Sequence, residues 1–90
     1  MTSTAAVSLQ HAFARHQAGD LAAACDLYRR FLAANPGHGE ASHLFGVALM
    51  QGGDLAGAKA MLEQAVAIDG GKAPWWNNLS LARYHSNDFP

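Results

Sequence analysis

Histidine is the residue type in this sequence whose number and spacing first suggest chemistry. Two histidines on one helix bind a metal ion best at i,i+4 spacing, which places both imidazoles on the same face. The pairs here are five residues apart, which rotates the second ring away from the first. We therefore favour surface or groove histidines without a metal, and a zinc or copper site assembled across helices from His16, His43 and His85 is the alternative. The five histidines are His11, His16, His38, His43 and His85.

Cys25 is the only cysteine in the chain, so an internal disulfide and a cysteine-based zinc site are both excluded. A nucleophilic thiol needs a base within hydrogen-bonding distance and an electropositive setting. Its helical neighbours Ala22, Ala23, Asp26 and Arg29 supply no base, so we expect Cys25 to pack as a small apolar side chain. The sequence also has no glycine-rich phosphate loop between a strand and a helix. It predicts no enzyme, no cofactor and no bound metal.

The composition is that of a single small folded domain spanning residues 1–90. Half of the residues are hydrophobic, 14% are charged, and the formal net charge is −1. Such a chain is too apolar to be disordered, and it lacks the basic face that neutralises nucleic-acid phosphates. No apolar run approaches the ~20 residues that span a bilayer, and residues 1–4 do not resemble the start of a secretory signal. We expect a cytoplasmic domain that binds neither nucleic acid nor membranes.

The elements that position these side chains follow from a repeat of 34 residues. The run Gly-Asp-Leu-Ala at residues 19–22 recurs at residues 53–56. When residues 5–38 are laid on residues 39–72, ten positions are identical, against about three expected by chance in so alanine-rich a chain. The same columns continue into a third copy. The sequence therefore predicts two full repeats, 5–38 and 39–72, followed by a half repeat or capping helix at residues 73–88.

Each repeat is predicted to be a pair of helices. Residues 5–18 and 39–52 are rich in good helix formers. A glycine then ends each helix in a left-handed conformation, and the aspartate after it caps the next helix. The second helices run over about 21–34 and 55–68, with apolar residues at helical spacing, and a fifth runs over about 73–87. The predicted fold is all-α, an α-solenoid of antiparallel helix pairs with five helices.

A 34-residue helical unit with these columns resembles the tetratricopeptide repeat. The pattern of that family has Trp, Leu, Gly and Tyr on the first helix, then Ala, an aromatic residue, Ala and Pro on the second. The matching residues are Ala12, Ala24, Tyr28 and Pro36 in the first repeat, Phe45, Gly46, Leu49, Ala58, Leu62 and Ala65 in the second, and Trp76, Leu79 and Ser80 in the third.

The resemblance implies which residues form the core. Ala12, Gly46 and Ser80 form a column of small residues where helices approach closely, so a leucine there would overpack the contact. Trp76 is expected to pack inward, whereas Trp75 is expected on an exposed flank. The large side chains expected in the core are Tyr28, Phe31, Phe45, Leu49, Leu62 and Trp76.

The resemblance also implies a peptide-binding groove. In this family the first helices of successive repeats line a concave surface that binds peptide. None of the matching positions here is a lysine or arginine that would clamp a carboxylate. The positions are Leu9, Phe13, His16, Gln17, Glu40, His43, Val47, Met50, Gln51, Asn77, Leu81, Tyr84 and His85.

The function implied is a non-catalytic module that binds a protein or peptide through an apolar or amphipathic segment. On the opposing interpretation, the residues of the groove only pack between helices. A further alternative is a structural repeat that forms a homo-oligomer through Trp75, Tyr84 and Phe89. A third is the N-terminal module of a larger enzyme, such as a glycosyl- or sulfotransferase.

Overall fold

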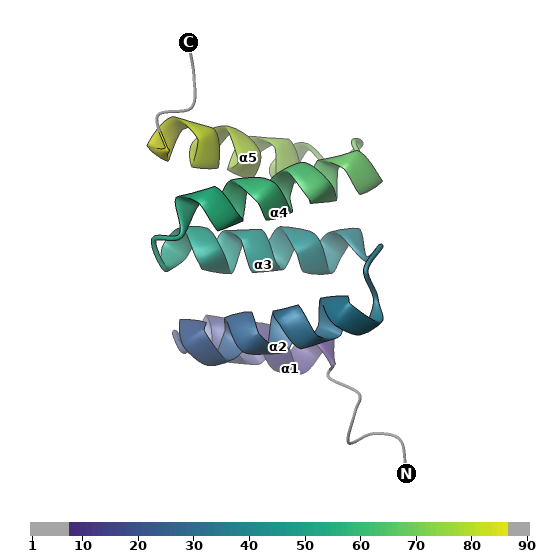
Figure 1. Ribbon diagram of the computed structural model, residues 1–90, viewed down its shortest axis with the longest axis vertical. Coiled ribbons are helices and arrows are strands. Elements are labelled where there is room, and N and C mark those ends of the chain that lie inside the picture. Colours follow the sequence, from purple (N-terminus) through teal and green to yellow (C-terminus); the bar gives the residue numbers. More distant parts are fainter. Residues whose placement is uncertain (1–7, 87–90) are drawn as a thin grey trace.

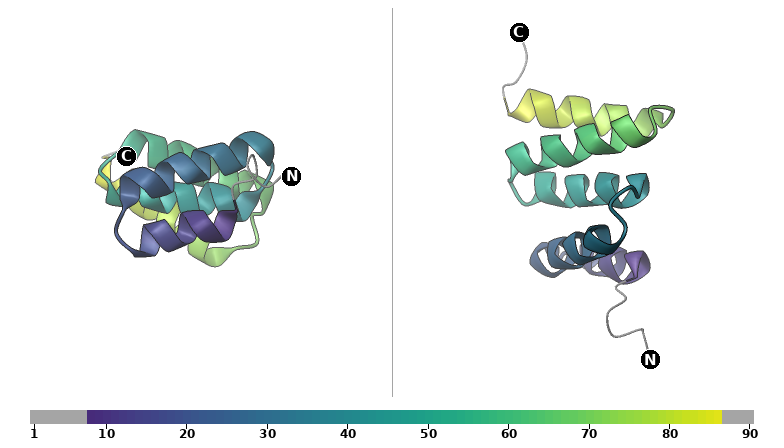
Figure 2. Two further views of the ribbon diagram at one scale, coloured as in Figure 1. Left: turned by 90° about the horizontal axis from the view of Figure 1, so that it is seen from below. Right: turned by 45° about the vertical axis from the view of Figure 1, so that its right-hand side comes forward.

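The computed structural model describes residues 8–86, which form a stack of five α-helices and contain no strand (Figure 1). Each helix packs against the next in the chain, and the right-hand view of Figure 2 shows them stacked in order, with α1 and α5 at opposite ends. This arrangement confirms the predicted all-α solenoid. The helices are α1 (Leu9–Gln17), α2 (Leu21–Ala34), α3 (Gly39–Gln51), α4 (Leu55–Ile68) and α5 (Ala73–His85).

The ends of two helices differ from the sequence prediction. Helix α1 begins at Leu9, because the side chain of Ser8 accepts a hydrogen bond from the backbone N–H of His11 at 2.9 Å and caps the helix there. Residues 5–7 of the predicted helix lie outside the described residues. Helix α5 ends at His85 rather than near residue 87. The other helix limits agree with the prediction to within one residue.

The turn inside each repeat has the same construction. Gly19 and Gly53 have φ angles of 86° and 93°, in the left-handed region that glycine adopts without a steric cost. Asp20 and Asp54 follow, and each accepts a hydrogen bond from the backbone N–H three residues later, at 3.2 and 2.9 Å. The predicted roles of glycine and aspartate are thus confirmed in both repeats.

The two turns between repeats differ from each other. Before α3, the side chain of His38 caps the helix by accepting a hydrogen bond from the backbone N–H of Ala41 at 3.2 Å, and its ring lies edge-on to Phe31. Before α5, Lys72 makes no capping hydrogen bond with its side chain, and Pro74 occupies the first turn. The second joint is held instead by a hydrogen bond from the indole N–H of Trp76 to the carbonyl oxygen of Gly70 at 2.8 Å.

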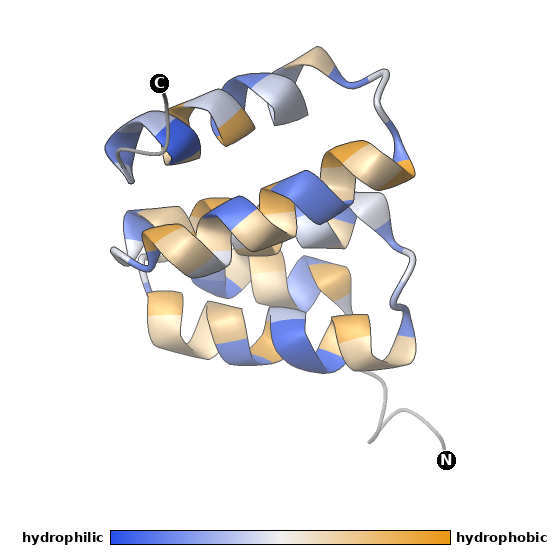
Figure 3. Ribbon diagram, turned by 45° about the horizontal axis from the view of Figure 1, so that its top comes forward, coloured by the Kyte–Doolittle hydropathy of each residue, from blue (hydrophilic) through white to orange (hydrophobic). Residues whose placement is uncertain are grey.

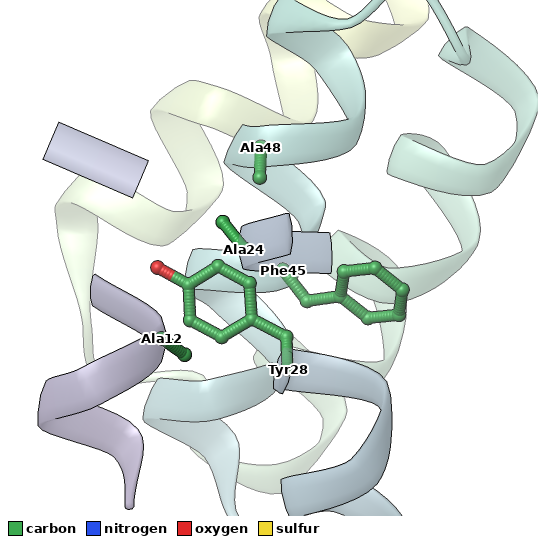
Figure 4. Close-up of a cluster of buried hydrophobic side chains, with 5 residues drawn as sticks. All are labelled: Ala12, Ala24, Tyr28, Phe45 and Ala48. Carbon is green, nitrogen blue, oxygen red and sulfur yellow. The ribbon is translucent and has the colours of Figure 1, made fainter. Parts of the chain in front are cut away.

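The core between the first three helices is built on alanine around two aromatic rings. Tyr28 and Phe45 lie with ring centroids 6.1 Å apart, and small residues let the helix backbones close around them (Figure 4). Both rings are buried, as the sequence predicted, whereas Phe31 and Leu49 are only half-buried. The buried cluster consists of Ala12, Ala24, Tyr28, Phe45 and Ala48.

A second cluster joins α4 to α5. Leu62 and Leu79 are its large members, and Ala58 and Ala82 complete it. Leu62 was predicted as core and is fully buried. The ribbon of α5 shows more blue and pale colour than that of α4, so its residues are on average less hydrophobic (Figure 3). Even so, α5 buries three side chains, Trp75, Leu79 and Ala82.

Helices α3 and α4 approach each other closely at Gly46. A Cβ atom there would lie 2.7 Å from Cγ of Leu62 and 3.3 Å from the carbonyl oxygen of Ala58, so only glycine fits without a shift. Ala12, in the same column, is also fully buried. Ser80, the third member of the column, is exposed, because no described helix packs on that side of α5. The small-residue column is therefore confirmed for two of its three members.

The two tryptophans of α5 are placed opposite to the sequence prediction. Trp75 is only 6% exposed, whereas Trp76 is 46% exposed. The ring of Trp75 stacks on His43 of the preceding repeat, and Trp76 shares a column with Ser42, which is fully buried in the second repeat. Among residues 8–86 no helix covers the equivalent side of α5. The expectation that Trp76 packs inward was wrong for this reason.

Substitution of Gly46 should test the close approach of α3 and α4. We expect Gly46→Leu to lower the free energy of unfolding by about 1–3 kcal/mol, because the side chain must displace Leu62. Gly57→Leu is the matched control on α4, where the nearest atoms belong to the capping carboxylate of Asp54, and alanine already occupies the same position in α2 at Ala23. If urea unfolding gives Gly46→Leu and Gly57→Leu the same free energy of unfolding, the close packing at Gly46 is contradicted.

Candidate functional site

One side of the stack is formed by the first helices of the repeats. Helix α3 touches both α1 and α5, whereas α2 and α4 make no contact with each other. Because the first helices are closer together, they form the inner side of the curved stack. We call the surface formed by α1, α3 and α5 the inner face.

All of the predicted groove positions lie on these three helices, but their surroundings differ. Phe13, Leu81 and Tyr84 are exposed, as are Gln17, Glu40, Gln51, Asn77 and His85. The remaining positions are half-buried, so they also pack between helices to some extent. The half-buried positions are Leu9, His16, His43, Val47 and Met50.

A pocket of about 210 Å³ opens between α1 and α3. Two of its walls, Leu9 and Phe13, were among the predicted groove residues. Gln10 and Leu44 were not among the predicted groove positions, although they share a column of the repeat and therefore lie at equivalent places on α1 and α3. The lining residues are Leu9, Gln10, Phe13, Glu40 and Leu44.

His16 is held in a chain of hydrogen bonds across three helices. Its Nε2 lies 2.7 Å from Oε1 of Gln51, an acceptor, so Nε2–H donates, and Nδ1 accepts from the hydroxyl of Tyr28 at 2.8 Å. Burial raises the pKa of Tyr28 to about 12, which keeps this hydroxyl protonated. The ring of Phe13 lies edge-on to His16, with centroids 6.1 Å apart. The imidazole therefore links α1, α2 and α3, and it positions one wall of the pocket.

His43 joins α3 to α5. Its Nε2 accepts a hydrogen bond from the side-chain amide of Asn78 at 2.9 Å, and its ring stacks on Trp75 at 5.3 Å with an interplanar angle of 19°. Its Nδ1 is buried and has no hydrogen-bond partner within residues 8–86. Burial lowers the pKa of His43, and the carboxylate of Glu40 opposes that shift. His43 is therefore a packed contact between repeats rather than a freely exposed imidazole.

The predicted metal alternative is not supported by the arrangement of the histidines. Within residues 8–86, no three side chains of His, Cys, Asp or Glu lie close enough together to hold a metal ion. His16 uses both of its ring nitrogens in hydrogen bonds, and His43 uses one. His85 is exposed at the last residue of α5.

Cys25 lies on α2, beside a pocket of about 290 Å³ that α2, α3 and the residues at the start of α4 enclose. Burial is the largest cause that raises the pKa of its thiol, so the thiol stays protonated and is a weak nucleophile. None of the side chains that line this pocket is a histidine, and besides Cys25 the only titratable side chain in its lining is that of Asp54. The half-buried thiol therefore packs as a small apolar group.

Comparison with known proteins identifies one family. The sequence profile described as tetratricopeptide repeat matches residues 15–83, more than half of the chain. No match is found among curated proteins. None of the helices in the described part of the chain is long and apolar enough to cross a membrane.

The lowered pKa of His43 predicts a stability that falls on acidification. Below its usual pKa of about 6.5 the unfolded chain binds a proton that the folded chain does not, so stability is lost until the pH reaches the lower folded pKa. The melting temperature should therefore fall as the pH drops through about 6.5, and His43→Gln should make the fall shallower. The exposed His11 gives the control variant, His11→Gln. Equal pH dependence in wild type and His43→Gln would contradict the assignment.

Proposed function

Because this chain belongs to the tetratricopeptide repeat family, whose domains typically bind protein partners, we propose that it is a non-catalytic module that binds a peptide segment on its inner face. The proposed partner is a cytoplasmic protein that offers an apolar or amphipathic segment. The proposal rests on the chemistry of the exposed side chains on α1, α3 and α5.

The main support is the position of the exposed apolar side chains. Five large hydrophobic residues are exposed within residues 8–86, and three of them are at inner-face positions: Phe13 at 38%, Leu81 at 43% and Tyr84 at 64% exposure. Covering such surface stabilises a complex by about 25 cal/mol for each Å² of apolar area removed from water. An apolar segment laid across the first helices would cover all three.

The charges of the inner face also favour an apolar partner. None of the predicted groove positions carries a lysine or arginine, so an acidic segment would find no fixed cation there. Val47 and Met50 lie half-buried on α3, between the exposed residues of α1 and α5. Methionine is flexible and adapts to side chains of different shapes. These features support binding through side-chain packing rather than through a carboxylate clamp.

Phe13→Glu should abolish capture of the native partner from a cell lysate while the domain stays folded. The side chain is exposed, and a carboxylate there would be desolvated by an apolar ligand. Ala60→Glu, on the exposed side of α4, is the matched control and should leave capture unchanged. Circular dichroism verifies the fold of both variants. If folded Phe13→Glu captures the partner as well as wild type does, the binding surface lies elsewhere.

A second proposal, self-association at α5, is favoured by one observation. The side of α5 that carries Trp76 and Ser80 is exposed, whereas the equivalent side of α3 is covered by α4. Exposed aromatic surface of this kind is frequent at protein interfaces. The set of residues changes from the sequence prediction: Trp75 is buried, Phe89 lies outside the described residues, and Tyr84 remains, joined by Trp76.

Sedimentation velocity over a range of concentrations tests self-association. If α5 forms the interface, the sedimentation coefficient should rise with concentration, and Trp76→Ala should suppress the rise. Tyr84→Ala should act in the same direction. Ile68→Ala removes an exposed apolar side chain at the end of α4 and is the control. A monomer at the highest concentration, unchanged in Trp76→Ala, would exclude self-association through this surface.

A further inference from the structure

We propose that the pocket between α1 and α3 binds one large apolar side chain of the partner, and that Glu40 at its rim pairs with a lysine or arginine adjacent to that side chain. This inference rests on the proposed function and specifies the ligand. The occupant is therefore a short segment in which an apolar and a basic residue are neighbours.

The size of the pocket fits a single side chain. Sites for whole small molecules usually have volumes of about 300–1,000 Å³, and this pocket has about 210 Å³. Its walls are Leu9, Phe13 and Leu44, with the polar residues Gln10 and Glu40 completing the lining. An apolar group that enters would contact three apolar side chains, and the two polar residues would stay available to the neighbouring parts of the ligand.

The walls of the pocket are fixed before any ligand binds. Leu9 and Leu44 pack against the buried cluster around Tyr28 and Phe45, which restricts their movement. The ring of Phe13 lies edge-on to His16, whose two nitrogens are both engaged in hydrogen bonds. A preformed pocket reduces the entropy that is lost on binding.

The charge of the pocket follows from Glu40. Of the six carboxylates within residues 8–86, it is the only one that neither accepts a hydrogen bond nor pairs with an arginine. It is exposed and lies in the first turn of α3, where the helix dipole stabilises a negative charge. The other five, all engaged, are Asp20, Asp26, Asp54, Glu63 and Asp69.

The remaining lining residues do not offset this charge. None of them is a cation, so a basic residue of the ligand has an acceptor at the pocket and an acidic residue has none. The apolar pocket and the carboxylate of Glu40 are thus complementary to an apolar side chain that has a basic neighbour. They disfavour the same apolar side chain next to an aspartate or glutamate.

Three peptide probes of equal length test this specificity by titration into the ¹⁵N-labelled protein. The first is acetyl-Gly-Ser-Lys-Phe-Ser-Gly-amide, the second has glutamate in place of lysine, and the third has alanine in place of phenylalanine. We expect the lysine–phenylalanine probe to shift the amide signals of α1 and the first turn of α3. Its Kd should be about threefold to tenfold lower than that of the glutamate probe, the range for an exposed ion pair and its repulsive counterpart. The alanine probe should bind more weakly than the lysine–phenylalanine probe.

Charge variants show whether Glu40 causes the preference. Glu40→Gln should abolish the difference between the lysine and glutamate probes, and Glu40→Lys should reverse it. Glu63→Gln removes an equal charge from α4 and should retain the preference, which excludes an effect of net charge alone. All three substitutions are at exposed side chains, so the fold is expected to remain intact.

The outcomes separate this inference from the proposed function. Equal affinity for the lysine and glutamate probes, with shifts still centred on the pocket, would overturn the pairing with Glu40 and leave peptide binding in place. Equal affinity for the phenylalanine and alanine probes would overturn the role of the pocket. If the probes bind only after residues 1–7 are deleted, that segment is the occupant of the pocket, and this result would also overturn the inference. If no probe shifts the inner face and Phe13→Glu leaves partner capture unchanged, the proposed function itself fails.

Discussion

The close packing of paired helices on small residues determines the geometry of the whole domain. Gly46 lets α3 approach α4 until Cγ of Leu62 lies 2.7 Å from where a Cβ atom would be, and Ala12 on α1 and Ala24 on α2 are fully buried. Each helix pair therefore packs as one unit, and the aromatic side chains of the core fill the space between the pairs. Tyr28, held in that core, presents its hydroxyl to His16, and His16 contacts Phe13. The positions of side chains on the inner face thus depend on contacts that the first helices make on their opposite side.

Two polar contacts set the spacing of the first helices along the stack. His16 reaches Gln51 and so joins α1 to α3, and His43 reaches Asn78 and so joins α3 to α5. Both contacts span 35 residues in the sequence. Apolar packing is not directional, so these hydrogen bonds add the specificity that fixes one helix relative to the next. Within residues 8–86 the buried Nδ1 of His43 has no hydrogen-bond partner, and leaving a buried polar atom unpaired has an energetic cost.

The fold could be predicted because a 34-residue period, left-handed glycines and capping aspartates are local signals that a sequence displays directly. The site could be predicted only in part. The columns of the repeat placed Leu9 and Phe13 on the inner face. Leu44 was not predicted, because the sequence does not show whether a leucine on a helix faces the core or a pocket. The prediction for the two tryptophans was wrong for a different reason. The pattern that places Trp76 inside assumes a covering helix, and the described chain does not supply one.

Within residues 8–86, α1 and α5 lie at opposite ends of the stack. Helix α5 has no side-chain cap at its start and leaves one side uncovered, and α1 buries only Ala12. Local undocking costs least where few buried contacts are lost, so these end helices are expected to separate before the middle of the stack. A ligand that reaches from Phe13 to Tyr84 would add contacts to α5 and oppose its separation. The affinity of such a ligand would be reduced by the fraction of molecules in which α5 is undocked, so the stability of the contact between α4 and α5 would influence binding at a distance from the pocket.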